Sequence, residues 1–529
     1  MNTSGALGTI HQIRDQFFYI EISLYNQIEG QKPFNVPFLY VDSINITETF
    51  QDWIVGGNIV FNTDFEIFAR GADSPIDSTN KIKAPYIDRT DGRNRLHITI
   101  YPVDKNEPKK FDKKYWELNY DFVVTDIRDL PVPNSQNKKR MYEFVDEKYQ
   151  ILKERNLEWS TAILAAKSIG KKPYELKDSE SALNSNDLLK KFLSLVATNP
   201  SQTSSNSLDA SGKVNVGFDN KGSIDKPNIP FDSIDTKTWN AGNPKNLIKA
   251  HGSAGSTALD DLYYILSRCV ASDGSPVLLR YGRSSIDKKW NLISIKDYFT
   301  KSANLQVERL IIEDGLDPNT PYIARAFNEI ASYVNNFTSG IASRIQKYKF
   351  SPMVSKDDNR ITNSPLHYFN FSDGSFNIMA KNNTAQSVVD SLTDYGKDGL
   401  YDLKNSKGQI LLNLNQTKTK GLMLAPVYST SGQFIPPNAS QVKMILDAIF
   451  LNQTLTFQVL GLTLRAPGCF IFIDRFGAGD KNPFDDRFLG QWLVTKVSHL
   501  FTQDTYITEL VCVKVDSFSP LWPKIDSKL

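Results

Sequence analysis

The chain has 529 residues, a length that predicts two to four compact units. Its 61 Lys and Arg residues nearly balance 59 Asp and Glu residues, for a formal net charge of +2. This balance argues against a dedicated nucleic-acid or polyanion binder, because such proteins carry a basic surplus. No apolar run approaches the roughly 18 residues of a membrane helix, and the N-terminal residues lack the pattern of a signal peptide. Three widely spaced cysteines favour a reduced protein made in a cytoplasm.

Residues 1–155 read as a β-rich unit. Alternating or β-branched runs predict strands at 17–25, 42–50, 53–61, 95–103 and 120–127. Gly56 and Gly57 stand between two apolar triplets and predict a two-residue hairpin turn. The run 141–152 fits a strand or a helix. A series of antiparallel strands with polar connections indicates a small barrel or sandwich.

Residues 156–198 turn helical, with Ser160 as a predicted N-cap and Gly170 followed by Pro173 as a predicted stop. A second helix within this stretch places Leu188, Phe192, Leu195 and Val196 on one face. Residues 199–230 are rich in Ser, Asn, Gly, Asp and Pro, so we expect a linker or loop there.

Residues 231–320 form a predicted α/β middle domain. Thr257 and Asp260 have capping-box spacing and precede an amphipathic helical pattern, which two short strands follow at 276–281 and 290–295. Region 321–400 is predicted to hold a long helix over 322–348 and connecting chain. Its apolar residues step by three or four: Ile323, Phe327, Ile330, Val334, Phe337, Ile341, Ile345 and Tyr348.

Residues 401–529 return to strands at 453–462 and 468–474, and then to a hairpin of 492–501 and 506–513 around a polar break at 502–504. Neither face of its first strand is purely apolar, so we expect the hairpin to be covered on both sides. The predicted class is therefore α+β and β-rich. Two small antiparallel β-barrel domains, 1–155 and 401–529, flank helical and α/β segments.

Motifs that carry chemistry are absent from the sequence. The five histidines (His11, His97, His251, His367 and His499) are isolated, and His499 is predicted to be a hydrogen-bonded structural residue. The run 92–97 allows an anion site, but a solvated turn entering a strand is favoured. The acidic run 479–490 lacks calcium-loop spacing, so a hairpin tip is preferred to a cation site. We therefore predict no catalytic, cofactor-binding or metal-binding residue, no cofactor and no enzyme activity.

The segment 467–513 resembles the closing barrel strands of central baseplate hub proteins of T4-like contractile-tail bacteriophages, and more distantly late-control and type VI spike hubs. The pattern is a Pro-Gly before a strand, a strand ending in His, a short turn and Tyr-x-Thr-x-Leu. Here it comprises Pro467, Gly468, Gly490, Trp492, Val494, Val497, His499, Tyr506, Thr508 and Leu510. Residues 42–61, 95–103 and 259–283 are similar to the first barrel and middle helix of such hubs, in the same order.

This resemblance implies a structural virion protein with two barrels per chain and three chains in a pseudo-sixfold ring. Such a homotrimer joins a threefold central spike to a sixfold tail tube or its tube-initiator proteins and contacts baseplate wedge and tape measure proteins. DNA only passes through its channel during ejection, and no membrane insertion is implied. The expected location is the tail baseplate of a virion, after synthesis in the host bacterial cytoplasm. The alternatives are a tail-associated cell-wall hydrolase and another baseplate component, such as a wedge or tube-initiator protein.

Overall fold

The computed structural model describes residues 8–14, 16–26, 34–50, 53–62, 94–104, 111, 113–131, 138–177, 180–198, 231–234, 250–266, 277–286, 290–294, 307–313, 323–326, 345–351, 367–370, 375–378, 424–427, 429–430, 433–434, 454–468, 470–476 and 490–514. The predicted linker at 199–230 lies outside these residues, as does all of the acidic run except Gly490. No helix in the described part of the chain is long and apolar enough to cross a membrane.

The N-terminal β-unit is an antiparallel sheet in the order β1-β2-β6-β7-β8-β5-β4, with β3 beside β2. Its elements are β1 (Thr9–Ile13), β2 (Gln16–Asn26), β3 (Phe34–Asn35), η1 (Phe38–Tyr40), β4 (Val41–Thr49), β5 (Val55–Asn62), β6 (Asn94–Val103), α1 (Lys113–Trp116), β7 (Leu118–Pro131) and β8 (Lys138–Asp146). Alternate residues of β4 face the core, where Ile44 and Ile46 are fully buried. The predicted strands of this region are confirmed.

The predicted hairpin turn at Gly56 and Gly57 is wrong, because both glycines lie inside the continuous strand β5. Gly57 pairs with Ile46 of β4, and a Cβ built on Gly57 would lie 1.8 Å from the Asn45 carbonyl oxygen. The glycine therefore permits a close approach between two strands and does not reverse the chain.

The ambiguous run 141–152 contains both structures. Strand β8 ends at Asp146, and helix α2 (Glu147–Glu154) begins at the next residue. The Asp146 carboxylate caps this helix by accepting hydrogen bonds from the backbone N–H groups of Lys148 (2.8 Å) and Tyr149 (3.3 Å).

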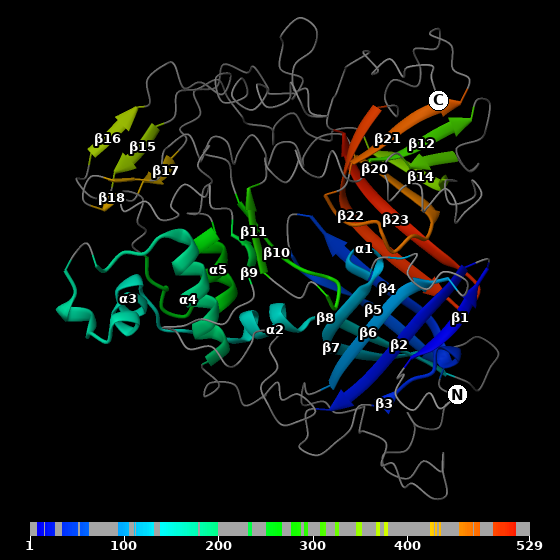
Figure 1. Cartoon of the computed structure of the whole chain (residues 1–529), viewed down its shortest axis with the longest axis horizontal. Helices are drawn as coiled ribbons and strands as arrows, with labels where there is room; N and C mark the ends of the chain where they lie inside the picture. The colour runs from blue at the N-terminus through cyan, green and yellow to red at the C-terminus, as the bar shows by residue number, and fades with distance from the viewer. Residues whose placement is uncertain are drawn as a thin grey trace, which may run out of the picture.

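A helical unit lies beside the sheet (Figure 1). It comprises α2, α3 (Thr161–Ile169), η3 (Pro173–Glu175), α4 (Ser185–Thr198) and α5 (Ala258–Leu266), together with a three-stranded sheet of β9 (Phe231–Ile234), β10 (Val277–Tyr281) and β11 (Trp290–Ser294). Ser160 accepts a hydrogen bond from the Ile163 N–H, and Gly170 closes α3 with a left-handed φ of 67°. Thr257 and Asp260 form the predicted capping box of α5. The predicted start and end of α3 and the predicted start of α5 are confirmed.

The C-terminal β-unit consists of β12 (Val307–Glu313), β13 (Ile323–Ala326), β14 (Ile345–Ser351), β20 (Thr454–Leu460), β21 (Phe470–Phe476), β22 (Gly490–Thr502) and β23 (Tyr506–Lys514). Two small sheets lie apart from it: β15 (His367–Asn370), β16 (Ser375–Ile378) and β17 (Leu424–Val427) in one, β18 (Ser429–Thr430) and β19 (Gln433–Phe434) in the other. The predicted hairpin is the pair β22 and β23, which confirms both strands and their break.

The long helix predicted over 322–348 is wrong at both of its ends. Residues 323–326 pair with β12, and residues 345–351 pair with β20. Long-range strand pairing therefore overrides the helical spacing of the apolar residues. The residues between these two strands lie outside the described part of the chain.

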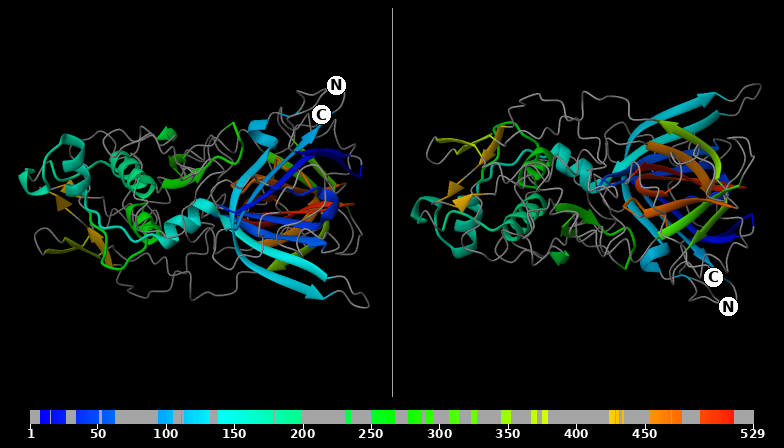
Figure 2. Two further views of the ribbon diagram at one scale, coloured as in Figure 1. Left: turned by 90° about the horizontal axis from the view of Figure 1, so that it is seen from below. Right: turned by 90° about the horizontal axis from the view of Figure 1, so that it is seen from above.

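The two β-units share one curled sheet of 15 strands, because β4 pairs directly with β22. Figure 2 shows the strands of both units wrapping around a common interior. The predicted β-rich α+β class is confirmed at this level. The division into two closed barrels and the limits of the six predicted segments stay predictions.

Candidate functional site: the junction between the β-units

Strand β22 belongs to both β-units at once. One of its edges pairs with β21 over 490–493 and then with β4 over 496–502, while the other edge pairs with β23. The register shifts between Val494 and Lys496, where the carbonyl oxygen of Thr495 accepts a hydrogen bond from the Phe50 N–H (2.7 Å). This bulge marks the point at which β22 passes from one unit to the other.

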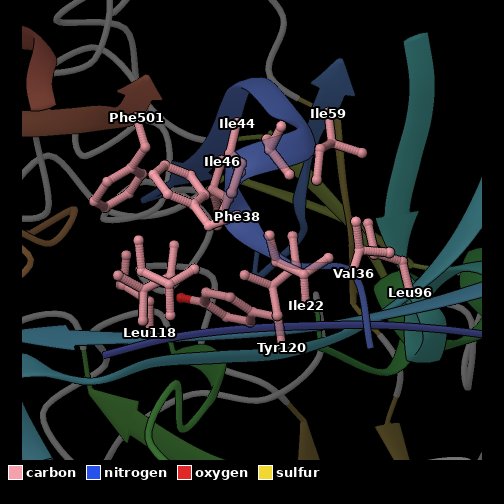
Figure 3. Packing of buried hydrophobic residues seen from close by; sticks show 14 of the residues in the cluster. Ile22, Val36, Phe38, Ile44, Ile46, Ile59, Leu96, Leu118, Tyr120 and Phe501 are labelled. Carbon is pink, nitrogen blue, oxygen red and sulfur yellow. The ribbon is translucent and has the colours of Figure 1, made fainter. Parts of the chain in front are cut away.

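The tip of the β22–β23 hairpin packs into the core of the N-terminal unit. The rings of Phe501 and Tyr506 stack with centroids 3.8 Å apart, and each meets Phe18 edge-on. Phe501 is paired with Ile44 of β4 and belongs to the same buried cluster as Ile44 and Ile46 (Figure 3). The same strand also carries the half-buried residues Lys496, Ser498 and Leu500, which face the other way. Both sides of the hairpin are therefore at least partly covered, as its mixed pattern predicts.

A buried carboxylate lies next to this hairpin. Glu48 of β4 is 6% exposed, and its two oxygens accept a hydrogen bond from the Tyr120 hydroxyl and one from Arg283 (3.3 Å). Nε2 of His499 is 3.4 Å from Oε2 of Glu48. These four residues come from β4, β7, β22 and the loop after β10, so the carboxylate is shared by three parts of the fold.

Arg283 binds both β-units with one guanidinium group. Besides Glu48 it donates to the carbonyl oxygens of Tyr115 (2.8 Å), Arg465 (3.0 Å) and Thr463. Its own carbonyl oxygen accepts a hydrogen bond from the Asn119 N–H (2.8 Å). The loop that carries Arg283 is thus inserted between the N-terminal and C-terminal units.

The next two residues of this loop bind a second buried carboxylate. Glu117, 1% exposed, accepts hydrogen bonds from the Ser284 hydroxyl (2.9 Å) and the Ser285 N–H (2.7 Å). Lys113 lies 3.7 Å from the other oxygen of Glu117. The loop therefore donates hydrogen bonds to two buried acids of the N-terminal unit. Arg283 donates to Glu48, and Ser284 and Ser285 donate to Glu117.

The surroundings of His499 favour its neutral form, in which it serves as a hydrogen-bonding partner. Burial lowers its pKa and raises the pKa of Tyr506, whose hydroxyl is 2.7 Å from Nδ1 of His499. The hydroxyl therefore donates to Nδ1, and Nε2 carries the proton that faces Glu48. The opposite tautomer would set a lone pair against the carboxylate. At 3.4 Å the contact with Glu48 is electrostatic, since Nε2 makes no hydrogen bond of normal geometry. The predicted structural role of His499 is confirmed.

The surroundings of Glu48 favour its ionised form. Burial by itself would raise the pKa of this carboxyl, but the Arg283 guanidinium, His499 and the Tyr120 hydroxyl together hold the pKa at about 2. The site is therefore a buried, charged contact that fixes the two β-units relative to each other. Among the described residues of this site, Glu48, Tyr120 and His499 are buried.

His97 is a second described histidine that lies between a carboxylate and a hydroxyl group. Its Nδ1 lies 2.7 Å from Asp121 and its Nε2 lies 2.9 Å from the Thr99 hydroxyl, which also accepts a hydrogen bond from Asn119 (2.7 Å). Thr99 is only 5% exposed, so its hydroxyl is not open to a substrate. The four residues form a satisfied polar ladder across β6 and β7. No group of three metal-ligating side chains occurs in the described residues.

The hypothesis for the run 92–97 needs correction, and the hypothesis for the run 479–490 stays open. Within the run 92–97, Arg95 is 4% exposed and bound to Glu147 (3.2 Å), so it belongs neither to a solvated turn nor to an open anion site. His251 is exposed, and His11 packs edge-on against Phe38. The hypotheses for 479–490 lie almost entirely outside the described residues.

Glu48, Glu117 and Arg283 were not predicted as site residues. One signal was present in the sequence: Glu48 is in phase with Ile44 and Ile46, which places a carboxylate on the core face of β4. Nothing local distinguishes Arg283, whose partners lie up to 235 residues away in the chain.

Neither a protein-family model nor a curated protein matches the chain. Among solved structures, the chain is similar to a tail protein from Neisseria meningitidis MC58 (10% identity, TM-score 0.42, covering 94% of this chain and 96% of that one). It is also similar to the 43 kDa tail protein of prophage MuSo2 from Shewanella oneidensis (8% identity, TM-score 0.41, covering 94% of this chain and 98% of that one). A third similar structure is a Francisella PdpA-VgrG complex (10% identity, TM-score 0.42). The similarity covers 97% of this chain and 54% of that one. These likenesses are too distant to assign the chain to a family.

Proposed function

We propose that the chain is a structural component of a contractile phage-type tail, namely the central hub of its baseplate. In this role three copies form a ring that joins a threefold spike to a sixfold tail tube and leaves a channel for DNA. The proposal rests on the resemblance of residues 467–513 to the closing strands of such hubs and on the structural position of the residues that carry this resemblance.

The observation that carries the proposal is that the shared residues build the strand pair joining the two β-units. Gly468 adopts a left-handed φ of 91° and donates its N–H to the Val494 carbonyl oxygen (2.7 Å). Thr508 is fully buried and accepts a hydrogen bond from the Leu462 N–H (3.2 Å). Trp492, Val494, Val497, His499, Tyr506 and Leu510 are all buried. The resemblance therefore concerns residues that determine the architecture of this hairpin.

The rigid connection between the β-units suits a ring component that carries load between spike and tube. A direct strand pairing, an inserted hairpin tip and a buried charge network all join the two units. The near-neutral net charge of +2 suits a channel wall that does not grip DNA phosphates. The expected partners are further copies of the chain, a spike, the tube or its initiator, and wedge and tape measure proteins, all in the virion tail.

The first experiment is the solution mass by light scattering across a dilution series. A species of three times 59.7 kDa supports the threefold ring. A monomer at every concentration, also after co-expression with the spike protein from the same genome, contradicts the hub. Six copies per virion, measured by quantitative mass spectrometry, would instead support a wedge component.

The proposal assigns no catalytic role to the chain. A zymogram with peptidoglycan tests this point against the alternative of a cell-wall hydrolase. A cleared band at the mass of the intact chain would contradict a purely structural function.

A further inference from the structure

The beginning of helix α2 brings five ionisable side chains to the outer face of the N-terminal sheet. Arg95 of β6 donates from Nε to Glu147 (3.2 Å), and Lys148 lies 3.5 Å from Asp146. Asp121 of β7 is close enough to Glu147 and Lys148 to influence the charge of both. Arg95, Asp146, Glu147 and Lys148 are each at most 4% exposed.

Other titratable groups surround this cluster, which we call the α2 charge cluster. His97 of β6 binds Asp121 (2.7 Å), and the ammonium of Lys148 lies 4.2 Å from the ring centroid of Tyr281 of β10. The charge of Asp146 helps to raise the pKa of Tyr120 of β7. The Tyr120 hydroxyl in turn donates a hydrogen bond to Glu48 at the junction. The cluster therefore lies where α2 and β10 of the helical unit meet the N-terminal sheet.

Among the described residues, the α2 charge cluster contains three acids, Asp121, Asp146 and Glu147, and two permanent cations, Arg95 and Lys148. Ionisation of Glu147, which is 4% exposed, would place a buried negative charge next to Asp146 and near Asp121. Burying an uncompensated charge is costly, and a buried acid avoids the cost by keeping its proton.

Glu147 is the acid that best holds this proton. Asp146 accepts hydrogen bonds from two backbone N–H groups as the cap of α2 and also contacts Lys148. Asp121 is about one third exposed and bound to His97. Within the described part of the chain, Glu147 accepts one hydrogen bond, from the Nε of Arg95. Burial raises the pKa of Glu147 to about 7, with Asp121 adding to the rise and Arg95 opposing it.

We propose that Glu147 is a proton-binding site that controls how tightly helix α2 packs on the N-terminal β-unit. With the proton bound, the α2 charge cluster is neutral and the helix stays in place. When the proton leaves, a buried negative charge faces Asp121 and Asp146, and α2 opens more often. Because Ile151 and Leu152 of α2 lie in the core of the helical unit, this opening loosens the attachment of that unit.

The direction of the effect follows from the two protonation states. The pKa of Glu147 in the folded chain, about 7, lies above its ordinary value of 4.5. The folded state therefore binds more protons than the opened state between these values, and α2 loses stability as pH rises through this window. The opening equilibrium of one such group changes by at most about tenfold per pH unit.

The test is hydrogen–deuterium exchange of the intact chain at pH 6 and pH 8, corrected for the intrinsic rate, comparing wild type with Glu147→Gln. Glutamine accepts the Arg95 hydrogen bond without carrying a charge, so this variant imitates the protonated acid. Glu158→Gln is the matched control, because Glu158 is exposed in the segment that follows α2. His499 and Glu48 lie at the junction between the β-units and remain unchanged in both variants.

We expect the amides of 147–154 in wild type and in Glu158→Gln to open several-fold more often at pH 8 than at pH 6. In Glu147→Gln the difference between the two pH values should disappear. Equal protection of wild type at both pH values, or the same pH dependence in Glu147→Gln as in wild type, would overturn the proposal. The wild-type measurement decides the question even where the variant fails to fold.

Discussion

The buried carboxylate of Glu48 forms an ion pair with the partly buried Arg283, with Nη1 and Oε2 3.3 Å apart, across 235 residues of sequence. Each residue also binds groups from other elements, so the pair connects the N-terminal sheet, the loop after β10 and the C-terminal hairpin. Replacing Arg283 leaves the buried Glu48 without its guanidinium partner, and replacing Glu48 leaves the guanidinium without its carboxylate. The energetic role of the pair therefore shows when one partner is removed.

The first prediction concerns Arg283→Met, which keeps much of the side-chain length but removes the charge. We expect a loss of about 3–5 kcal/mol in the free energy of unfolding, because Glu48 and three carbonyl oxygens lose their donor. Urea unfolding followed by tryptophan fluorescence measures it. The control is Arg128→Met on β7, whose ion pairs are exposed and should contribute little. Equal effects of the two substitutions would contradict a structural role for the junction.

The second prediction uses the pH dependence of Glu48. Its pKa in the folded chain is about 2, below the ordinary 4.5, so the ionised carboxylate stabilises the fold above pH 4.5. This contribution is lost as pH falls from 4.5 toward 2. Glu48→Gln should therefore be less stable than wild type at pH 6, and the gap should narrow at pH 3. Thermal unfolding at both pH values measures the gap, and a gap that widens in acid would contradict the assignment.

The third prediction concerns the hairpin tip. Phe501→Ala should cost about 3–5 kcal/mol, because it leaves a cavity between Phe18, Tyr506 and the strand β4. Leu500→Ala is the matched control, since Leu500 is the preceding residue and only half-buried. Amide exchange in 41–49 should rise in Phe501→Ala and stay near wild type in the control. A similar response to both substitutions would mean that the tip does not hold the N-terminal core.

Local signals predicted local structure well, whereas long-range contacts had no sequence signature. Ser160, Gly170 and the Thr257–Asp260 pair each mark a helix end through a hydrogen bond or a backbone angle within a few residues. By contrast, Ile345 has helical spacing but forms part of a strand whose partner is more than a hundred residues away. The pairing of β4 with β22 joins residues about 450 positions apart, and no local pattern specifies it.

The same distinction applies to the candidate site. His499 was interpretable as a structural histidine because it alternates with Val497 and Phe501 in one strand. Glu48 carried a weaker signal, a carboxylate on the apolar face of its strand, and its meaning depends on a cation from another unit. The role of a buried charged residue can be predicted only when its partner is known, and here the partner lies 235 residues away in the sequence.

The last prediction concerns Gly57, the position at which the sequence pattern was misinterpreted. If Gly57 were part of a turn with a left-handed backbone angle, alanine would cost only about 1–2 kcal/mol, because an L residue is sterically strained there. In the sheet, a methyl group at Gly57 meets the Asn45 carbonyl oxygen at 1.8 Å, so β4 and β5 must separate. Gly170→Ala supplies the comparison, because Gly170 has a left-handed φ of 67° and nothing within 4 Å of its added methyl. We therefore expect Gly57→Ala to be destabilised by clearly more than Gly170→Ala in thermal unfolding, with faster amide exchange in β4 and β5. Equal effects would indicate that β4 and β5 tolerate the separation and that backbone freedom dominates at both positions.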